Sequence, residues 1–201
     1  GKTVGWFYDR MEFGPRALGH RSIIGDPRSK SMQKIMNLKI KFRESFRPFA
    51  PSILLNESKN WFYFEKESPY MLFVAQLKNN KRLNLRNNKN KLKGLKLLQL
   101  HRSVIPAVTH VDYSARLQTV DKKFNIKYYN LIKKFYDLTN CPLLINTSFN
   151  VRGEPIVCTP KNAIECFMST NLDALIIENF FILKNKQENK LKNIRVREFE
   201  S

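Results

Sequence analysis

The sequence predicts an α/β or α+β domain in which strands and helices intermix along the chain. Short apolar runs typical of buried strands alternate with segments whose apolar residues recur every three or four positions, as on one helix face. The length of 201 residues suits a single domain, and 42% apolar with 12% aromatic content suffices for a core. No apolar run approaches the roughly 20 residues that a membrane helix needs.

The first half of the chain is expected to contain two strands and one helix. The strands are predicted at residues 4–8 and 70–77, and the residues that follow the first strand, rich in Gly and Pro, are predicted to form a loop up to Pro27. Between 29 and 40, Met32, Ile35, Met36 and Ile40 are spaced for one helical face. A basic, aromatic segment ending at Pro51 follows this helix.

The second half is expected to hold two helices and five short strands. Strands are predicted at 105–108, 115–120, 142–145, 174–177 and 180–183. The clearest helix spans 125–138, where apolar residues recur at three- and four-residue steps. A second helix is predicted from Thr159, a good N-cap followed by Pro160, to about Ser169. Residues 184–201 are expected to be a charged, frayed tail.

The formal net charge of +19 predicts anionic partners, because a basic surface attracts phosphates and nucleic acids without selecting between them. Residues 78–96 hold eight basic residues and no acidic one. We interpret 78–100 as an insertion or solvated loop. The alternative is a nucleic-acid contact, although this stretch has no aromatic residue on which a base could stack.

The remaining composition favours a reducing compartment and offers no metal motif. Cys141, Cys158 and Cys166 show neither paired nor metal-type spacing, and no signal peptide is recognised, so a cytoplasmic location is expected. Three scattered histidines predict no metal site. The chain starts at Gly1 and enters a strand at once, so we expect it to be a piece of a longer protein.

Two arginine-rich blocks are candidates for anion binding. Residues 9–22 place three arginines, Arg16 among them, around two glycines. Glycine lets backbone N–H groups approach an anion, and arginine can bind phosphate through two parallel hydrogen bonds. Residues 41–51 alternate Lys41, Arg43 and Arg47 with phenylalanines that could fix the loop. The alternatives are a simple turn with solvated arginines and an exposed basic loop.

Two further blocks follow in the second half. Residues 110–120 lead from a polar turn into a strand that carries Arg116, while His110 is interpreted as a structural hydrogen-bonding residue. Residues 146–155 place Asn146, Ser148 and Asn150 directly after a buried strand, a common position for ligand sites in open α/β sheets. The alternative is a polar turn without a ligand.

Taken together and in order, these blocks resemble the C-terminal domain of the carbamoyltransferase family that includes nodulation protein U and the tobramycin and cephamycin O-carbamoyltransferases. The shared motifs are RMEFGPRALG at 10–19, IKFRE at 40–44, FRPFAP at 46–51, HVD at 110–112, ARLQTV at 115–120 and NTSFNVRGEPIV at 146–157. The agreement runs from about Val4 to Leu183. Tyr113 and Ser114 stand where family members often carry Gly-Thr, which puts the acceptor or the loop geometry in doubt.

The resemblance implies a YrdC-like fold, a twisted mixed sheet with flanking helices, over residues 1–183. It implies that this domain forms carbamoyl-adenylate from carbamoyl phosphate and ATP with Mg²⁺, and that no cofactor is tightly bound. A separate N-terminal, Kae1-like domain, absent from this sequence, would then move the carbamoyl group to an acceptor hydroxyl.

The resemblance also assigns roles to residues. It makes Lys41 and Arg47 catalytic and gives carbamoyl phosphate and ATP contacts to Arg16, Arg43, Arg116, Asn146, Ser148 and Asn150. The alternatives are a basic, RNA-binding YrdC-like module and a non-catalytic partner domain.

Overall fold

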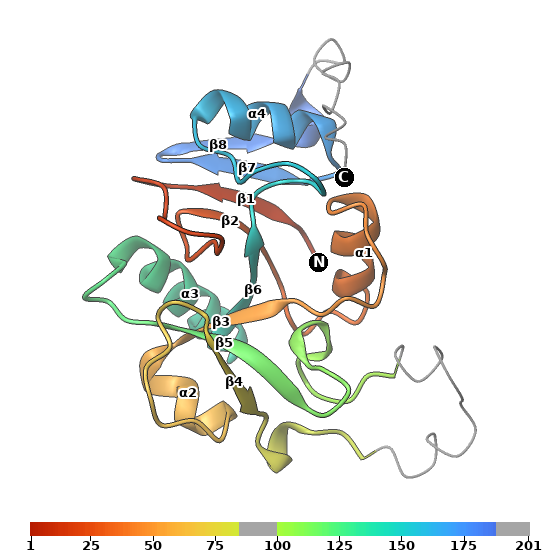
Figure 1. Ribbon diagram of the computed structural model, residues 1–201, viewed down its shortest axis with the longest axis vertical. Coiled ribbons are helices and arrows are strands. Elements are labelled where there is room, and N and C mark those ends of the chain that lie inside the picture. The colour runs from red at the N-terminus through yellow and green to blue at the C-terminus, as the bar shows by residue number, and fades with distance from the viewer. Residues whose placement is uncertain (85–99, 188–201) are drawn as a thin grey trace.

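A computed structural model describes residues 1–84 and 100–187 and shows, within them, a mixed eight-stranded sheet with four α-helices (Figure 1). The strands are β1 (Val4–Phe7), β2 (Arg21–Gly25), β3 (Ala50–Leu54), β4 (Phe73–Gln76), β5 (Ser114–Val120), β6 (Leu143–Ser148), β7 (Ala174–Ile177) and β8 (Phe180–Leu183). The helices are α1 (Met32–Lys39), α2 (Leu55–Trp61), α3 (Ile126–Thr139) and α4 (Pro160–Ser169). The predicted α/β class is confirmed.

The strands lie in the order β4-β5-β3-β6-β2-β1-β7-β8. Strand β1 is parallel to β7 and β3 is parallel to β5, whereas the other neighbouring pairs are antiparallel. The site described below therefore depends on pairings between segments that are far apart in the sequence.

Helices cover both faces of the sheet. Because consecutive strand residues point to opposite faces, Trp6 and Ile24 pack with Tyr128 and Ile132 of α3, whereas their neighbours contribute to the larger core cluster. That larger cluster contains Met32, Met36 and Ile40 from α1 and its end, and Ala163, Cys166 and Phe167 from α4. The result is a three-layer arrangement, with α3 on one face and α1 and α4 on the other (Figure 1).

Two helix predictions are confirmed, one of them together with its predicted N-cap, Thr159. The Asn125 side chain accepts a hydrogen bond from the Tyr128 N–H at the start of α3, and Asn140 ends this helix in a left-handed conformation. Helix α4 starts with a reciprocal capping box between Thr159 and Asn162 and has Pro160 at its first position.

Three elements of the first half were not predicted. Strand β2 lies inside the expected loop. Its five residues are all buried, but it begins with the polar Arg21 and Ser22, so its sequence does not show the apolar run of a buried strand. Strand β3 is central and contains Pro51, and proline in a sequence argues against a central strand. The short helix α2 follows β3 directly.

The strand predicted at 105–108 is wrong. Residues Pro106–Val108 form a single 3₁₀ turn. Proline has no N–H to donate to a ladder, and the Ala107 N–H donates instead to the Pro27 carbonyl at 3.2 Å. Ile105 and Val108 are fully buried, which accounts for the apolar run.

Two predicted peripheral segments are only partly described. Of residues 78–100, Asn79–Lys81 form a 3₁₀ turn, and 85–99 lie outside the described residues. Of the expected tail, Lys184–Lys186 form another 3₁₀ turn, which corrects a frayed start at 184, while 188–201 lie outside. No helix of the described chain combines the length and the apolar character needed to cross a bilayer.

Candidate functional site

A cavity of about 530 Å³ lies where the four sequence blocks meet. Six of the eight predicted site residues line it, namely Arg16, Arg43, Arg47, Arg116, Asn146 and Ser148. Its other lining residues are Pro15, Ala17, Pro48, Phe49, Ala50, Met71, Val74, His110 and Thr147. Within the described chain, the lining contains four arginines and neither Asp nor Glu, so the cavity suits an anionic ligand.

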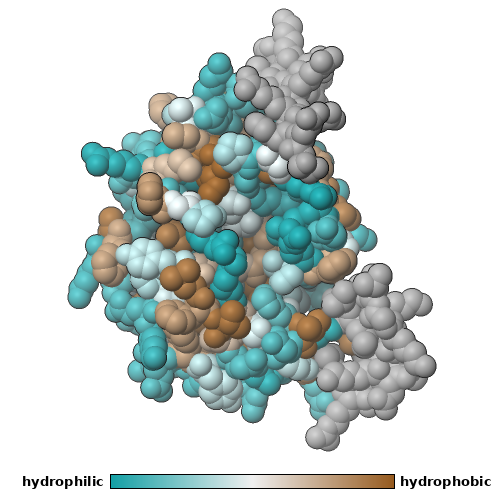
Figure 2. All heavy atoms as spheres, in the orientation of Figure 1, coloured by the Kyte–Doolittle hydropathy of each residue, from teal (hydrophilic) through white to brown (hydrophobic). Residues whose placement is uncertain are grey.

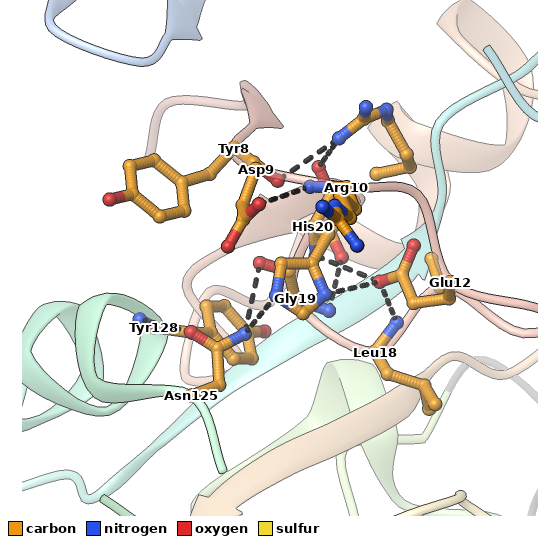
Figure 3. A network of polar contacts seen from close by, with 12 residues as sticks. Tyr8, Asp9, Arg10, Glu12, Leu18, Gly19, His20, Asn125 and Tyr128 are labelled. Carbon is orange, nitrogen blue, oxygen red and sulfur yellow. Dashed lines mark hydrogen bonds and ion pairs between the residues drawn. The ribbon is translucent and has the colours of Figure 1, made fainter. Parts of the chain in front are cut away.

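The first block carries Arg16 on a loop between β1 and β2. The sequence suggested that backbone N–H groups of this loop would approach a bound anion, but two of them bind the chain's own Glu12. The Glu12 Oε1 atom accepts hydrogen bonds from the N–H groups of Leu18 at 2.6 Å and His20 at 2.8 Å (Figure 3). Arg16 is the charged residue of this block that lines the cavity.

The other two arginines of this block do not line the cavity. Arg21 is buried, lies 3.5 Å from the centre of the Phe7 ring and donates to the carbonyl groups of Tyr8, His20 and Cys158. Arg10 is exposed. The alternative of a solvated arginine fits Arg10, whereas Arg21 is buried and connects β2 to neighbouring segments.

The second block is fixed by Asn37, a fully buried residue of α1. Its amide donates to the carbonyl of Arg47 at 2.7 Å and its Oδ1 accepts from Arg43 Nε at 2.6 Å. The Arg43 guanidinium lies 4.8 Å from the Phe49 ring centre, so an aromatic side chain does support this loop. Burial, with the nearby charge of Arg47, lowers the pKa of Arg43 to about 10.

Lys41 lies beneath the cavity, where it is 4% exposed, and does not line it. Its Nζ atom lies 2.6 Å from both the Ser148 carbonyl and Asn150 Oδ1, 2.9 Å from the Asn150 carbonyl and 3.2 Å from Ser148 Oγ. Burial, followed by the nearby charge of Arg43, lowers the pKa of Lys41 to about 7, although four surrounding oxygen atoms favour the ammonium form. Lys41 thus joins the second block to the fourth.

Asn150 also lies outside the cavity lining. Its Oδ1 accepts from Lys41 and from the Ser148 hydroxyl at 2.7 Å, and its amide donates to the Glu154 carbonyl at 2.6 Å. The structure therefore brings Lys41, Ser148 and Asn150 together, with Ser148 as the member that reaches the cavity.

The third block contributes Arg116 from β5, two positions before Gln118 on the same strand. The Arg116 Nε atom is buried without a hydrogen-bond partner, and its Nη2 atom has only a weak contact to Met71 Sδ at 3.8 Å. Burial, with the charge of Arg16, lowers the pKa of Arg116. A half-buried guanidinium whose donors are not saturated can bind an anion at low cost.

Gln118 and Asn146 form a buried amide pair next to the cavity. The Asn146 amide donates to Gln118 Oε1 at 2.8 Å and to the Ala17 carbonyl at 2.9 Å, while Gln118 donates to the Leu18 carbonyl at 2.8 Å. This pair connects β5 and β6 to the Arg16 loop. The Asn146 Oδ1 atom remains buried without a partner.

Four residues near the site were missed or given a lesser role by the sequence analysis, namely Glu12, Asn37, His110 and Gln118. His110 lines the cavity, and burial lowers its pKa, with Asp112 opposing and Arg116 adding to the shift. Gln118 could have been found from the sequence, because residues two positions apart on a strand point to the same face and Arg116 was already a candidate. Nothing in the local sequence distinguishes Asn37 from an ordinary helix residue.

The chain is similar to members of a known protein family. Residues 1–184 match the family described as carbamoyltransferase C-terminus. The chain is 57% identical over 93% of its length to an uncharacterized protein of Synechocystis sp. and 40% identical over 92% to nodulation protein NolO of Bradyrhizobium diazoefficiens. It is 38% identical over 82% to nodulation protein U of Sinorhizobium fredii.

These matches cover 30%, 30% and 25% of the three relatives, so the chain spans less than a third of their length. The match nonetheless includes nearly all described residues and every residue that lines the cavity. The chain therefore belongs to the carbamoyltransferase C-terminus family.

Proposed function

We propose that this domain binds carbamoyl phosphate and ATP with Mg²⁺ in the arginine-lined cavity and forms carbamoyl-adenylate. The observation that carries the proposal is the convergence of Arg16, Arg43, Arg47 and Arg116 on one cavity without a lining carboxylate. Two phosphorylated anions repel each other, and four guanidinium groups around one cavity offset that repulsion.

The reaction has two steps. Water first cleaves carbamoyl phosphate to carbamate and inorganic phosphate. A carbamate oxygen then attacks the α-phosphorus of ATP, and the P–O bond to the β-phosphate breaks, so that pyrophosphate leaves with the bonding electrons and carbamoyl-adenylate remains. The protein's part is to hold the two anions in line and to stabilise the charge that gathers on pyrophosphate.

The proposed role of each residue follows from its position at the cavity. Arg47 is exposed at the cavity, with Glu44 at 3.6 Å, and is free to approach a triphosphate. Arg116 offers a buried Nε donor that has no partner, and Ser148 offers a hydroxyl that Lys41 contacts. Lys41 thus acts in this proposal chiefly through Ser148 and Asn150.

Transfer of the carbamoyl group to an acceptor hydroxyl is assigned, in the same proposal, to a Kae1-like domain in the full-length protein or on a separate chain. Under this division the described domain makes the activated intermediate. Its product would be released to, or held for, that second domain.

The test is incubation with carbamoyl phosphate, ATP and Mg²⁺, with pyrophosphate and AMP measured over time. Arg47→Ala and Arg116→Ala are each expected to slow pyrophosphate release roughly a hundredfold, because each removes a preorganised donor to the developing charge. Lys41→Ala is expected to lower the rate as well, by releasing the Ser148 turn.

Arg10→Ala is the matched control, since Arg10 belongs to the same motif as Arg16 but does not line the cavity. It should retain the rate of the unsubstituted protein. Equal pyrophosphate release by all four variants would remove the cavity from the reaction.

A further inference from the structure

The loop that carries Arg16 has little to hold it except polar contacts. At its tip, Phe13 is fully exposed, and a side chain placed on Gly14 would meet nothing within 4 Å. Ala17 is the buried apolar residue of the loop. The described structure gives the Arg16 side chain no ion-pair partner, so the position of its guanidinium depends on how the loop backbone is fixed.

The carbonyl groups of the loop bind side chains from other segments, whereas two of its N–H groups bind a side chain of the loop itself. The carbonyl groups of Ala17, Leu18 and Gly19 accept hydrogen bonds from Asn146, Gln118 and Trp6, respectively, at 2.8 to 2.9 Å. The N–H groups of Leu18 and His20 both donate to Glu12 Oε1, from the other end of the loop (Figure 3).

We propose that Glu12 is a positioning residue, whose carboxylate closes the loop between residues 12 and 20 and thereby holds Arg16 at the cavity. The inference rests on the proposed function for its ligand. Glu12 itself does not line the cavity and is not proposed to contact substrate.

A carboxylate suits this place for two reasons. One of its oxygen atoms accepts hydrogen bonds from the N–H groups of Leu18 and His20. These two bonds join the start of the loop to its end and restrict the motion of residues 13–17 between them. The same atom also occupies two backbone donors, those of Leu18 and His20, that could otherwise bind a phosphate group. The Glu12 side chain is only 7% exposed, which strengthens both hydrogen bonds.

The experiment measures inorganic tripolyphosphate and ATP binding by calorimetry for Glu12→Ala, Glu12→Gln, Arg16→Ala and the double variant Glu12→Ala/Arg16→Ala. Glu12→Ala and Arg16→Ala are each expected to weaken tripolyphosphate binding on the order of tenfold. The double variant should be no weaker than the weaker single variant, because Glu12 acts through Arg16. Glu12→Gln keeps an oxygen acceptor and should restore most of the affinity.

Asp173→Ala is the matched control for a general loss of stability. One oxygen atom of Asp173, Oδ2, likewise accepts two hydrogen bonds, from the Thr3 N–H and hydroxyl, both at 2.9 Å. Asp173 precedes β7, near the opposite edge of the sheet from β4 and β5, and does not line the cavity. Its loss should lower the melting temperature and leave tripolyphosphate affinity unchanged. Amide hydrogen exchange at Leu18 and His20 should accelerate in Glu12→Ala but not in Asp173→Ala.

Three outcomes would overturn the inference. Unchanged affinity in a folded Glu12→Ala, or additive losses in the double variant, would remove the role of Glu12 while leaving the proposed function intact. If the unsubstituted protein bound neither tripolyphosphate nor ATP, both the role and the proposed function would fail.

Discussion

At the scale of single residues, Lys41 is the clearest case in which burial and charge oppose each other. Its ammonium group is surrounded by oxygen atoms of Ser148 and Asn150, yet burial lowers its pKa to about 7 from the ordinary 10.5. A folded-state pKa below the unfolded one makes the folded protein release a proton first as the pH rises. The contribution of Lys41 to stability should therefore grow with pH between those two values.

This expectation can be measured as the difference in unfolding free energy between the unsubstituted protein and Lys41→Met. The difference should shift in favour of Lys41 by up to about 1.4 kcal/mol per pH unit between pH 7 and 10, and level off below pH 7. Denaturant unfolding at several pH values gives the curve, and the exposed Lys34→Met on α1 gives its baseline. A constant difference would show that the ammonium persists.

Individual site residues could be predicted where a side chain itself carries the chemistry. The four arginines and Ser148 reach the cavity as expected, since guanidinium and hydroxyl groups in these motifs are typical of phosphate sites. Glu12 and Asn37 could not be predicted, because their importance lies in backbone groups six to ten positions away that only folding brings into reach.

At the scale of elements, the Arg16 loop meets helix α3 at Gly19. A side chain at Gly19 would overlap the ring of Tyr128, and the residue has a φ of +110°. Gly14 in the same loop has a φ of +125° but open space around it. A substitution at Gly14 would therefore introduce backbone strain only, whereas one at Gly19 would introduce both strain and steric overlap with Tyr128.

Gly14→Ala is expected to cost about 1 kcal/mol of unfolding free energy through strain alone. Gly19→Ala should cost about 3 kcal/mol, since α3 must move or the loop must shift. Denaturant unfolding of both variants provides the comparison. Equal losses of unfolding free energy would contradict this expectation, because they would mean that the loop and α3 can move apart at Gly19 with no loss of stability.

Element prediction succeeded where a periodic pattern and a capping residue coincide, as in α3 and α4. It failed where tertiary pairing overrides local preference. Strand β3 is central despite Pro51, because β5 and β6 supply partners on both sides. The turn at Pro106 looked like a strand because buried turns and buried strands share apolar composition.

At the scale of the whole molecule, the charge of +19 raises the question of nucleic-acid binding. The space-filling view shows hydrophilic residues over much of one face and a hydrophobic group below its centre, in the part of the view that β3, β4 and β5 occupy in Figure 1 (Figure 2). Residues 85–99 contribute five basic residues to this charge, whereas the arginines that line the described cavity stand at positions 16, 43, 47 and 116. Non-specific polyanion binding and the proposed catalytic site should therefore be separable.

Replacing residues 85–99 with a short Gly-Ser linker is expected to weaken RNA binding and to flatten its dependence on salt, while ATP and carbamoyl phosphate binding stay unchanged. Fluorescence anisotropy with RNA at two salt concentrations, beside calorimetry with ATP, tests this. The deletion should spare Lys81, which lies 4.3 Å from the ring centre of Trp61. Loss of ATP binding would contradict the separation.

Strand β1 has one more consequence, for synthesis of the protein on the ribosome. It pairs with β2 on one side, where Val4 faces Ile24, and with β7 on the other, where Val4 faces Ala174. The nascent chain can form the first pairing early but must wait for some 170 residues before the second. Throughout that interval one edge of β1 lacks its partner, so the first strand of this domain is among the last to be protected from other chains.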